Sequence, residues 1–150
     1  MIKHIKCDIF ESGADIICHQ VNCQGAMNSG IAKQVREKYP IVYEAYTEWC
    51  SQNKPDYLLG RAQPVNTECK TIIVNIFAQE NFGYDGKCYT DYSALRNGLK
   101  TVHLNFKNNT IAIPYLMGCH RGGGDWNVVY KMIEEIFSDC EVLICEYNGG

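Results

Sequence analysis

The sequence has no run of apolar residues long enough to cross a membrane, and it has no excess of basic charge. A spanning helix needs about 20 consecutive apolar residues, so we expect no membrane partner. The net charge is −3, with 14 Lys and Arg against 17 Asp and Glu. Proteins that grip duplex nucleic acid usually present a basic face, so we expect no sequence-specific nucleic-acid binding. Residues 1–6 also lack the apolar core of a signal peptide, which favours a cytoplasmic location.

The cysteines lack the spacing of a metal-binding or disulfide framework. No C-x-x-C occurs among the nine cysteines, which argues against a zinc ribbon. The count is odd, and cysteines such as Cys18 and Cys145 stand inside apolar runs. We therefore expect reduced cysteines that behave as small hydrophobic side chains.

Internal repeats and linkers rich in Pro, Gly and Ser are also absent, so we expect one domain over residues 1–150. Short runs of apolar, mostly β-branched residues predict buried strands at 15–21, 71–77, 110–113 and 141–145, with a short edge strand at 1–6. Near-continuous apolar strands are typical of a sheet that is covered on both faces.

Helical spacing fills the segments between these strands. One helix is expected from Ser29 and a second from Pro40, which can occupy a first helical turn without losing a hydrogen bond. Thr90 is expected to cap a third helix. Asp125 is expected to cap a fourth, whose inward residues would be Val128, Val129, Met132, Ile133 and Ile136. Alternating strands and helices predict an α/β sandwich with much parallel pairing, in which ligands bind at the carboxyl ends of the strands.

The loop at 21–32 leaves a predicted strand and enters a predicted helix. Its sequence Asn28-Ser29-Gly30 places free N–H groups at a helix N-terminus, where the helix dipole favours an anion. An ordinary turn with a serine cap would fit the same residues. Neither G-x-x-x-x-G-K-S/T nor G-x-G-x-x-G occurs in the chain.

The loop at 117–126 also leaves a strand and enters a helix, and it contains three consecutive glycines at 122–124. Such a run is entropically costly, and close approach of the backbone to an anion would justify it. Neither loop has the lysine and hydroxyl pair that holds a magnesium nucleotide. Together they predict a phosphate-bearing ligand that is bound by backbone dipoles, with no metal and no other cofactor.

Residues 19–34 resemble the first ligand loop of macrodomains, which bind ADP-ribose. Residues 7–10 resemble the Gly-Asp-Leu/Ile-Phe entry of the family, and residues 113–119 with the following glycines resemble its second loop. The nearest branches are the terminal ADP-ribose protein glycohydrolases and the yeast-type ADP-ribose-1″-phosphate phosphatases. The resemblance implies a three-layer α/β/α sandwich around a mixed, largely parallel sheet.

The same resemblance implies a set of ligand-binding residues. Asp8 would accept a hydrogen bond from the adenine amino group, the backbone N–H of Ile9 would meet an adenine ring nitrogen, and Asn22 would face the distal ribose. The loops would hold the pyrophosphate, and Tyr147 would line the adenine side. The whole implied set is Asp8, Ile9, His19, Asn22, Gly25, Met27, Asn28, Ser29, Gly30, Ile31, Ala32, Met117, Gly118, Cys119, His120, Arg121, Gly122 and Tyr147.

The chain departs from the family at the catalytic positions. The glycohydrolases use a lysine where this chain has Gln79, and an aspartate early in the second loop where it has Arg121 or Gly122. Asp125 is either that carboxylate displaced or only a helix cap. His19 is either an acid or base or a core histidine. Asp125 and His19 are the catalytic candidates.

Three functions therefore remain open at this stage. They are hydrolysis of an ADP-ribosyl bond to a modified macromolecule, dephosphorylation of ADP-ribose-1″-phosphate, and non-catalytic recognition of ADP-ribose.

Overall fold

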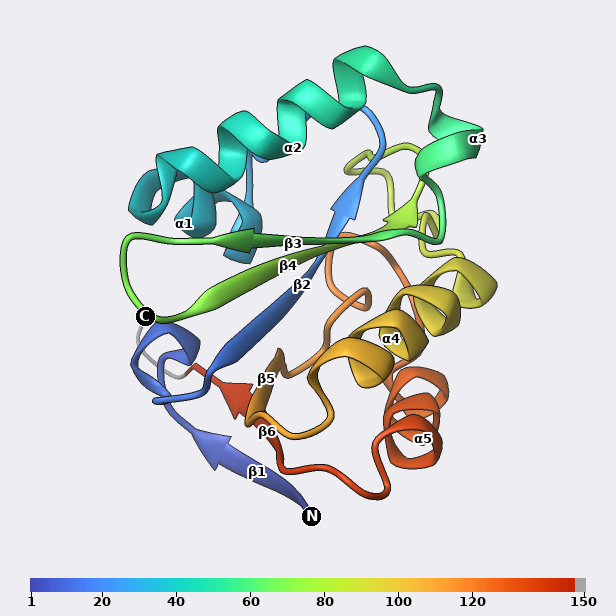
Figure 1. Cartoon of the computed structure of the whole chain (residues 1–150). Helices are drawn as coiled ribbons and strands as arrows, with labels where there is room; N and C mark the ends of the chain where they lie inside the picture. The colour runs from blue at the N-terminus through green and yellow to red at the C-terminus, as the bar shows by residue number, and fades with distance from the viewer. Residues whose placement is uncertain (148–150) are drawn as a thin grey trace.

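The computed structural model describes residues 1–147 and contains a six-stranded sheet in the order β1-β6-β5-β2-β4-β3 (Figure 1). The strands are β1 Ile2–Lys6, β2 Ile16–Asn22, β3 Ala62–Asn66, β4 Ile72–Gln79, β5 Ile111–Pro114 and β6 Val142–Glu146. Every neighbouring pair is parallel except β3 with β4. The mixed, largely parallel sheet is thereby confirmed, as are the strands expected from the sequence.

Helices cover both faces of this sheet (Figure 1). One face carries α1 Gly30–Lys38, α2 Pro40–Gln52 and the short α3 Pro55–Leu58, and the other carries α4 Tyr92–Phe106 and α5 Trp126–Ile136. A 3-10 turn, η1 Ile9–Glu11, follows β1. The central strands β2 and β4 are buried along nearly their whole length, because helices lie above and below them. Among residues 1–147, no helix is long and apolar enough to span a bilayer.

The sequence did not predict β3, the one antiparallel strand of the sheet as described. Pro64 lies in its middle and cannot donate a ladder hydrogen bond, so the residue marks a segment as non-strand or edge strand. The structure resolves this ambiguity, since β3 pairs only with β4 and lies at the edge.

Two local expectations were wrong. The cap of α4 is Asp91, whose carboxylate accepts a hydrogen bond from the Ala94 N–H at 3.0 Å, while Thr90 forms an isolated bridge with Gln79. Val128, the third residue of α5, is 41% exposed and is therefore not one of the inward residues. The cap of α5 is Asp125 as expected, with its carboxylate 2.9 Å from the Asn127 nitrogen.

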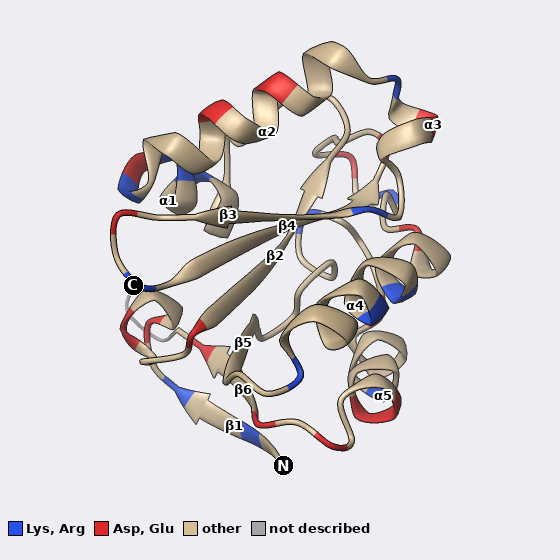
Figure 2. Cartoon of the chain, viewed as in Figure 1, with Lys and Arg blue, Asp and Glu red and all other residues tan. Residues whose placement is uncertain are grey.

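Charged residues are distributed over the helices and connections. Figure 2 shows Lys and Arg interspersed with Asp and Glu there, while β2 and β4 are almost free of both. Four of the nine cysteines, Cys18, Cys23, Cys140 and Cys145, are buried. Burial in the apolar clusters of the core fits their expected role as small hydrophobic side chains.

Replacing Asp91 by alanine should lower the free energy of unfolding by about 1 kcal/mol, since α4 loses its side-chain cap. Urea denaturation followed by circular dichroism measures the change. Asp125→Ala removes the equivalent cap of α5 and serves as the matched comparison. Unchanged stability in Asp91→Ala would contradict the assignment of this cap.

Candidate functional site

A cleft of about 390 Å³ opens at the carboxyl ends of four strands, a volume typical of small-molecule sites. The last residues of β2, β4, β5 and β6, namely Asn22, Gln79, Pro114 and Glu146, all line it. The expected position of a ligand site in an α/β sheet is the crevice outside these strand ends, so the fold places the cleft where the sequence predicts it.

Asn22 organises the first loop. Its Oδ1 accepts hydrogen bonds from the Gln24 and Ala26 N–H groups, at 2.9 and 3.3 Å, and from the Tyr46 hydroxyl at 2.8 Å. Its Nδ2 donates to the Ala26 carbonyl at 2.8 Å. Tyr46 comes from α2 and is fully buried. The Asn22 side chain therefore holds the loop in place, although the residue also lines the cleft.

The N-terminus of α1 faces the cleft without a side-chain cap. Ser29 occupies the cap position in an extended conformation, yet its hydroxyl forms no capping hydrogen bond. Residues 28–32 line the cleft, and the first N–H groups of any helix have no partner within the helix. The ordinary serine-capped turn is therefore not what forms here. Free N–H groups at a helix N-terminus can receive an anion, and anion binding here stays a prediction.

The second loop is folded tightly against the segment 87–90. The Gly118 carbonyl accepts hydrogen bonds from the Thr90 hydroxyl at 2.6 Å and the Gly124 N–H at 2.9 Å. A Cβ atom on Gly123 would lie 2.4 Å from the Lys87 carbonyl oxygen. The glycine run is therefore required by contacts within the protein, a reason that the sequence alone did not reveal. Gly118 and Gly122 still line the cleft.

His19 is held by a buried chain of side-chain amides. The Gln63 amide nitrogen donates to the Ala45 carbonyl at 3.0 Å, which leaves Gln63 Oε1 to accept from Asn75 Nδ2 at 3.0 Å. Asn75 Oδ1 is consequently an acceptor for His19 Nε2, 2.6 Å away. These bonds assign the proton of His19 to Nε2. They leave Nδ1 as a buried acceptor without a partner in the described chain.

His19 stays neutral over the physiological pH range. It is 2% exposed, and burial lowers the pKa of its imidazole to about 4 against the opposing effect of the Asn75 hydrogen bond. It also lines the cleft. His19 is thus both a core histidine and a cleft residue, two roles that the sequence presented as alternatives.

Gln20 and Gln79 form a second polar cluster on the other side of the cleft floor. Gln20 Nε2 donates to Gln79 Oε1 and to the Thr90 hydroxyl, at 2.9 Å each, and Gln79 Nε2 donates to the Asn81 carbonyl at 2.8 Å. Gln20 Oε1 has no partner within residues 1–147. Gln79 lines the cleft where the family carries its lysine, and its amide is engaged in positioning the loop that follows β4.

That loop supplies an aromatic rim that the sequence analysis missed. Phe82 and Tyr84 line the cleft and are 43% and 63% exposed, and the Arg121 guanidinium lies 4.5 Å from the centre of the Tyr84 ring. The sequence signal that could have found them is a pair of aromatic residues shortly after the strand predicted at 71–77. His120 and Arg121 are exposed in the second loop and line the cleft as well.

Several expected ligand residues lie away from the cleft. Met27 is fully buried in the cluster with Tyr46 and Phe77, so its side chain belongs to the core. Gly25 occupies the turn of the first loop with φ of 80°, and the Cys119 thiol donates back to the Met117 carbonyl at 3.4 Å. Neither Gly25 nor Cys119 lines the described cleft.

Asp8 and Ile9 lie just beyond the Tyr147 end of the cleft. Asp8 Oδ1 accepts from the Phe10 N–H at 3.0 Å and caps η1, while Ile9 is buried. A backbone hydrogen bond of 3.0 Å from Cys7 to Glu146 places Asp8 beside the last residues of β6. Adenine recognition by Asp8 and Ile9 stays a prediction.

Asp125 does not line the described cleft either. It is exposed, and its carboxylate caps α5, so the structure favours the cap over the displaced catalytic carboxylate. Lys87 is exposed, pairs with Asp85 at 3.7 Å and likewise does not line the cleft. Among cleft residues the charged side chains are Arg121 and Glu146, and Glu146 is bonded to His4 at 2.7 Å.

Comparison with solved structures identifies this architecture. A protein of unknown function from Bacteroides thetaiotaomicron matches with a TM-score of 0.85 and 28% identity, over 97% of this chain and 98% of that one. The macrodomain of Mycobacterium tuberculosis DarG matches with a TM-score of 0.81 and 23% identity, over 100% and 99%. This chain has the macrodomain fold. DarTG of Thermosipho africanus, in complex with ADP-ribose, matches this macrodomain with a TM-score of 0.79 and 20% identity, over 97% of this chain and 41% of that one.

No family model matches the chain, but curated proteins do. DNA ADP-ribosyl glycohydrolase of M. tuberculosis is 26% identical over 157 residues, covering 100% of this chain and 43% of that protein. The ADP-ribose 1″-phosphate phosphatase of Aspergillus oryzae is 39% identical over 77 residues, covering 47% of this chain and 38% of that protein. The macrodomain thus spans less than half the length of both. Its relatives include both an ADP-ribosyl glycohydrolase and an ADP-ribose 1″-phosphate phosphatase, the two kinds of protein that its loops resemble.

The lowered pKa of His19 predicts a loss of stability in mild acid. The unfolded chain binds a proton at His19 near pH 6.5 and the folded chain only near pH 4. The contribution of neutral His19 to the free energy of unfolding is therefore complete above pH 6.5 and is lost progressively as the pH falls to 4. When the pH falls from 7 to 4.5, the free energy of unfolding should decrease by roughly 2 to 3 kcal/mol less in His19→Gln than in the natural chain.

Urea denaturation at both pH values measures this difference. His4→Gln, which removes an exposed histidine, is the control. Equal pH dependence in His19→Gln and the natural chain would contradict the neutral buried state.

Proposed function

We propose that this macrodomain binds ADP-ribose in the cleft and removes it from a modified macromolecule. The observation that carries the proposal is the pair of backbone elements on the cleft wall. They are the uncapped N-terminus of α1 and the second loop at Gly118 and Gly122. A pyrophosphate between them would receive N–H groups and the positive end of a helix dipole. That DarTG of Thermosipho africanus, a protein with the same fold, was solved in complex with ADP-ribose supports ADP-ribose as the ligand.

The polar groups of the cleft suit a ribose beyond the pyrophosphate. His19 Nδ1 and Gln20 Oε1 are buried acceptors without partners in the described chain, and an unpaired buried acceptor costs roughly 1–3 kcal/mol. A hydroxyl group of the distal ribose would supply the donor for Gln20 Oε1, and the attacking water would supply the donor for His19 Nδ1. At the opposite end, Tyr147 lines the cleft and Asp8 lies beside it, where a carboxylate could accept from the adenine amino group.

Hydrolysis in this cleft would use water directly. Gln79 has no nucleophilic amine, so no Schiff base can form at the position of the family lysine. Water would attack the anomeric carbon of the distal ribose, the bond to the macromolecule would break, and the leaving group would take a proton. Of the two catalytic candidates, His19 is favoured over Asp125, because His19 lines the cleft with a free nitrogen lone pair while Asp125 caps α5. Because burial lowers the pKa of His19 to about 4, it is a weak base at neutral pH, and its contribution to the rate would lie at the lower end of the usual range, about 10²-fold.

The rim of Phe82, Tyr84 and Arg121 supports a nucleobase as the leaving group. Planar aromatic and guanidinium groups stack on bases, whereas an acidic protein side chain offers no ring to stack. The relatives named as DNA ADP-ribosyl glycohydrolases are consistent with this choice. ADP-ribosylated single-stranded DNA is therefore the proposed substrate.

Dephosphorylation of ADP-ribose-1″-phosphate is the second candidate. The similarity to the fungal phosphatase is higher than that to the glycohydrolase, although it covers less of the chain. His120 and Arg121 line the cleft and could contact a terminal phosphate. Recognition of ADP-ribose without turnover is the third reading and becomes the better account if neither substrate is consumed.

ADP-ribose should bind with micromolar affinity, about −8 kcal/mol, and its guanine analogue should bind much more weakly. Asp8→Ala should lose at least about tenfold in affinity, or 1.4 kcal/mol. Asp8→Asn keeps one oxygen to cap η1 but puts an NH₂ group in place of the oxygen that would face adenine. A loss of affinity in this variant would therefore come from adenine recognition and not from the lost cap. Isothermal titration calorimetry measures all three. Equal affinities for the adenine and guanine ligands would remove the role of Asp8, and an absolute need for Mg²⁺ would contradict the backbone phosphate site.

Turnover should depend on His19 and hardly on Asp125. We expect His19→Ala to slow release of ADP-ribose from modified DNA by about 10²-fold, as for a weak base, while Asp125→Ala, with its α5 cap removed, changes mainly stability. Product release is followed by mass spectrometry, with ADP-ribosylated protein and ADP-ribose-1″-phosphate as alternative substrates. Borohydride should trap no adduct. A covalent adduct that disappears in Lys87→Ala would overturn the water-based route, and consumption of the phosphate alone would favour the phosphatase.

A further inference from the structure

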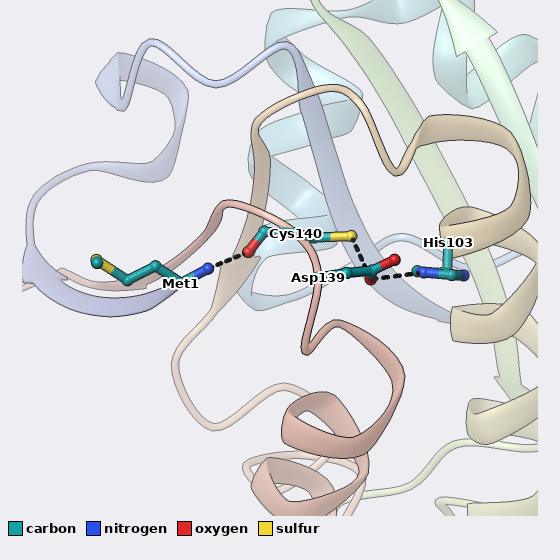
Figure 3. Close-up of polar contacts among 4 residues, drawn as sticks. All are labelled: Met1, His103, Asp139 and Cys140. Atoms are coloured by element: carbon teal, nitrogen blue, oxygen red, sulfur yellow. Dashed lines mark hydrogen bonds and ion pairs between the residues drawn. The ribbon is translucent and has the colours of Figure 1, made fainter.

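Three potential metal ligands meet at the edge of the sheet opposite the cleft. His103 stands near the C-terminal end of α4, and Asp139 and Cys140 lie in the turn between α5 and β6. This turn precedes the amino end of β6, whereas the cleft lies at its carboxyl end. Figure 3 shows the His103 ring and the Cys140 thiol both directed at the Asp139 carboxylate. The group plays no part in the proposed function.

The ligand atoms are already close together. His103 Nε2 lies 2.8 Å and Cys140 Sγ 3.4 Å from the same oxygen, Asp139 Oδ1, and all three ligand atoms lie within 4.8 Å of one another. Zinc with ligands at about 2.0–2.3 Å holds them roughly 3.3–3.7 Å apart in a tetrahedron. Small side-chain rotations therefore suffice to form a site. Within residues 1–147 this is the one group of three or more such ligands.

We propose that His103, Asp139 and Cys140 bind a divalent zinc ion. Imidazole nitrogen, carboxylate oxygen and thiolate sulfur are the three ligand types that zinc accepts. Asp139 is exposed, so water can complete the fourth position. Calcium and magnesium need more oxygen ligands than this group offers.

The surroundings allow the exchange of protons for metal. The thiol and the imidazole both donate a hydrogen bond to the same carboxylate oxygen, Asp139 Oδ1. On binding, the thiol would release its proton to solvent, and the imidazole would shift its proton from Nε2 to Nδ1 so that Nε2 can bind zinc. Asp139 and the Cys140 thiolate then balance the two charges of the ion. The Met1 amino group is held by the Cys140 backbone carbonyl and by Glu141, not by the thiol (Figure 3).

Zinc at this place would be structural. His103 and Asp139 come from separate elements, and the ion would fasten the α5–β6 turn to the last turn of α4. Cys140 belongs to the apolar core, and His103 packs edge-on against Phe137 at 6.0 Å. The site would therefore stabilise the layer of α4 and α5 without reaching the cleft.

Cobalt(II) titration of the chelator-treated, reduced full chain tests the proposal, because a thiolate ligand gives a charge-transfer absorption. We expect this absorption with one equivalent of cobalt, its displacement by zinc, and a higher melting temperature with zinc. His103→Gln should lower the affinity by roughly tenfold or more, since removing a ligand should cost no less than removing an outer-shell partner. His103→Gln keeps all nine thiols, so it discriminates this site from random thiol binding.

His4→Gln is the matched control, because His4 also pairs with a carboxylate, Glu146 at 2.7 Å, but belongs to no three-ligand group in the described chain. It should bind cobalt like the natural chain. Cys140→Ser should lose the absorption, with circular dichroism as the check on folding. Equal affinity in His103→Gln and the natural chain, or bound cobalt without thiolate absorption, would overturn the proposal.

Discussion

Burial of the carboxyl end of β2 is the constraint on which the site depends. This strand lies inside the sheet with helices over both faces, yet it ends in His19, Gln20, Val21 and Asn22, three of which are polar. Because buried polar groups must find partners within the protein, each of the three recruits a different neighbour. His19 engages β4 and β3, Gln20 engages β4 and the segment before α4, and Asn22 engages the first loop and α2. The partners of one strand end thereby fix most of the cleft floor.

The second loop shows how packing and function share the same residues. Its glycines permit contacts with the segment 87–90 that any side chain would block, and the Gly118 carbonyl is held by Thr90. Leu116, immediately before this loop, adopts a positive φ of 65°, a conformation that is costly outside glycine. Contacts within the protein therefore hold the N–H groups of this loop in place. Preorganised N–H groups need little rearrangement to receive a charged group, which suits both binding and catalysis.

Groups that favour anions and groups that favour a cation lie at opposite edges of the sheet. At the carboxyl edge of the sheet, helix and loop N–H groups favour anions, and the lining carries Arg121 but only one carboxylate, which is already paired. At the opposite edge, Asp139 lies beside a histidine and a thiol, an arrangement that favours a cation. The hydrogen bond from His103, followed by that from Cys140, lowers the pKa of Asp139 and keeps it charged, while burial and the adjacent carboxylate raise the pKa of Cys140 to about 11. A metal ion would compete with that thiol proton.

The sequence by itself determined the strands at 15–21, 71–77, 110–113 and 141–145, the four longer helices and the two loops, because periodicity, glycine and proline act locally. It also pointed to an anion at the start of α1. Tertiary structure alone decided that Met27 belongs to the core, that Asp91 rather than Thr90 caps α4, and that Phe82 and Tyr84 border the cleft. It also brought together His19 with Asn75 and His103 with Asp139, residues 56 and 36 positions apart. Burial and partners of this kind depend on how distant elements pack, and no local pattern in a single sequence encodes which side chains will meet.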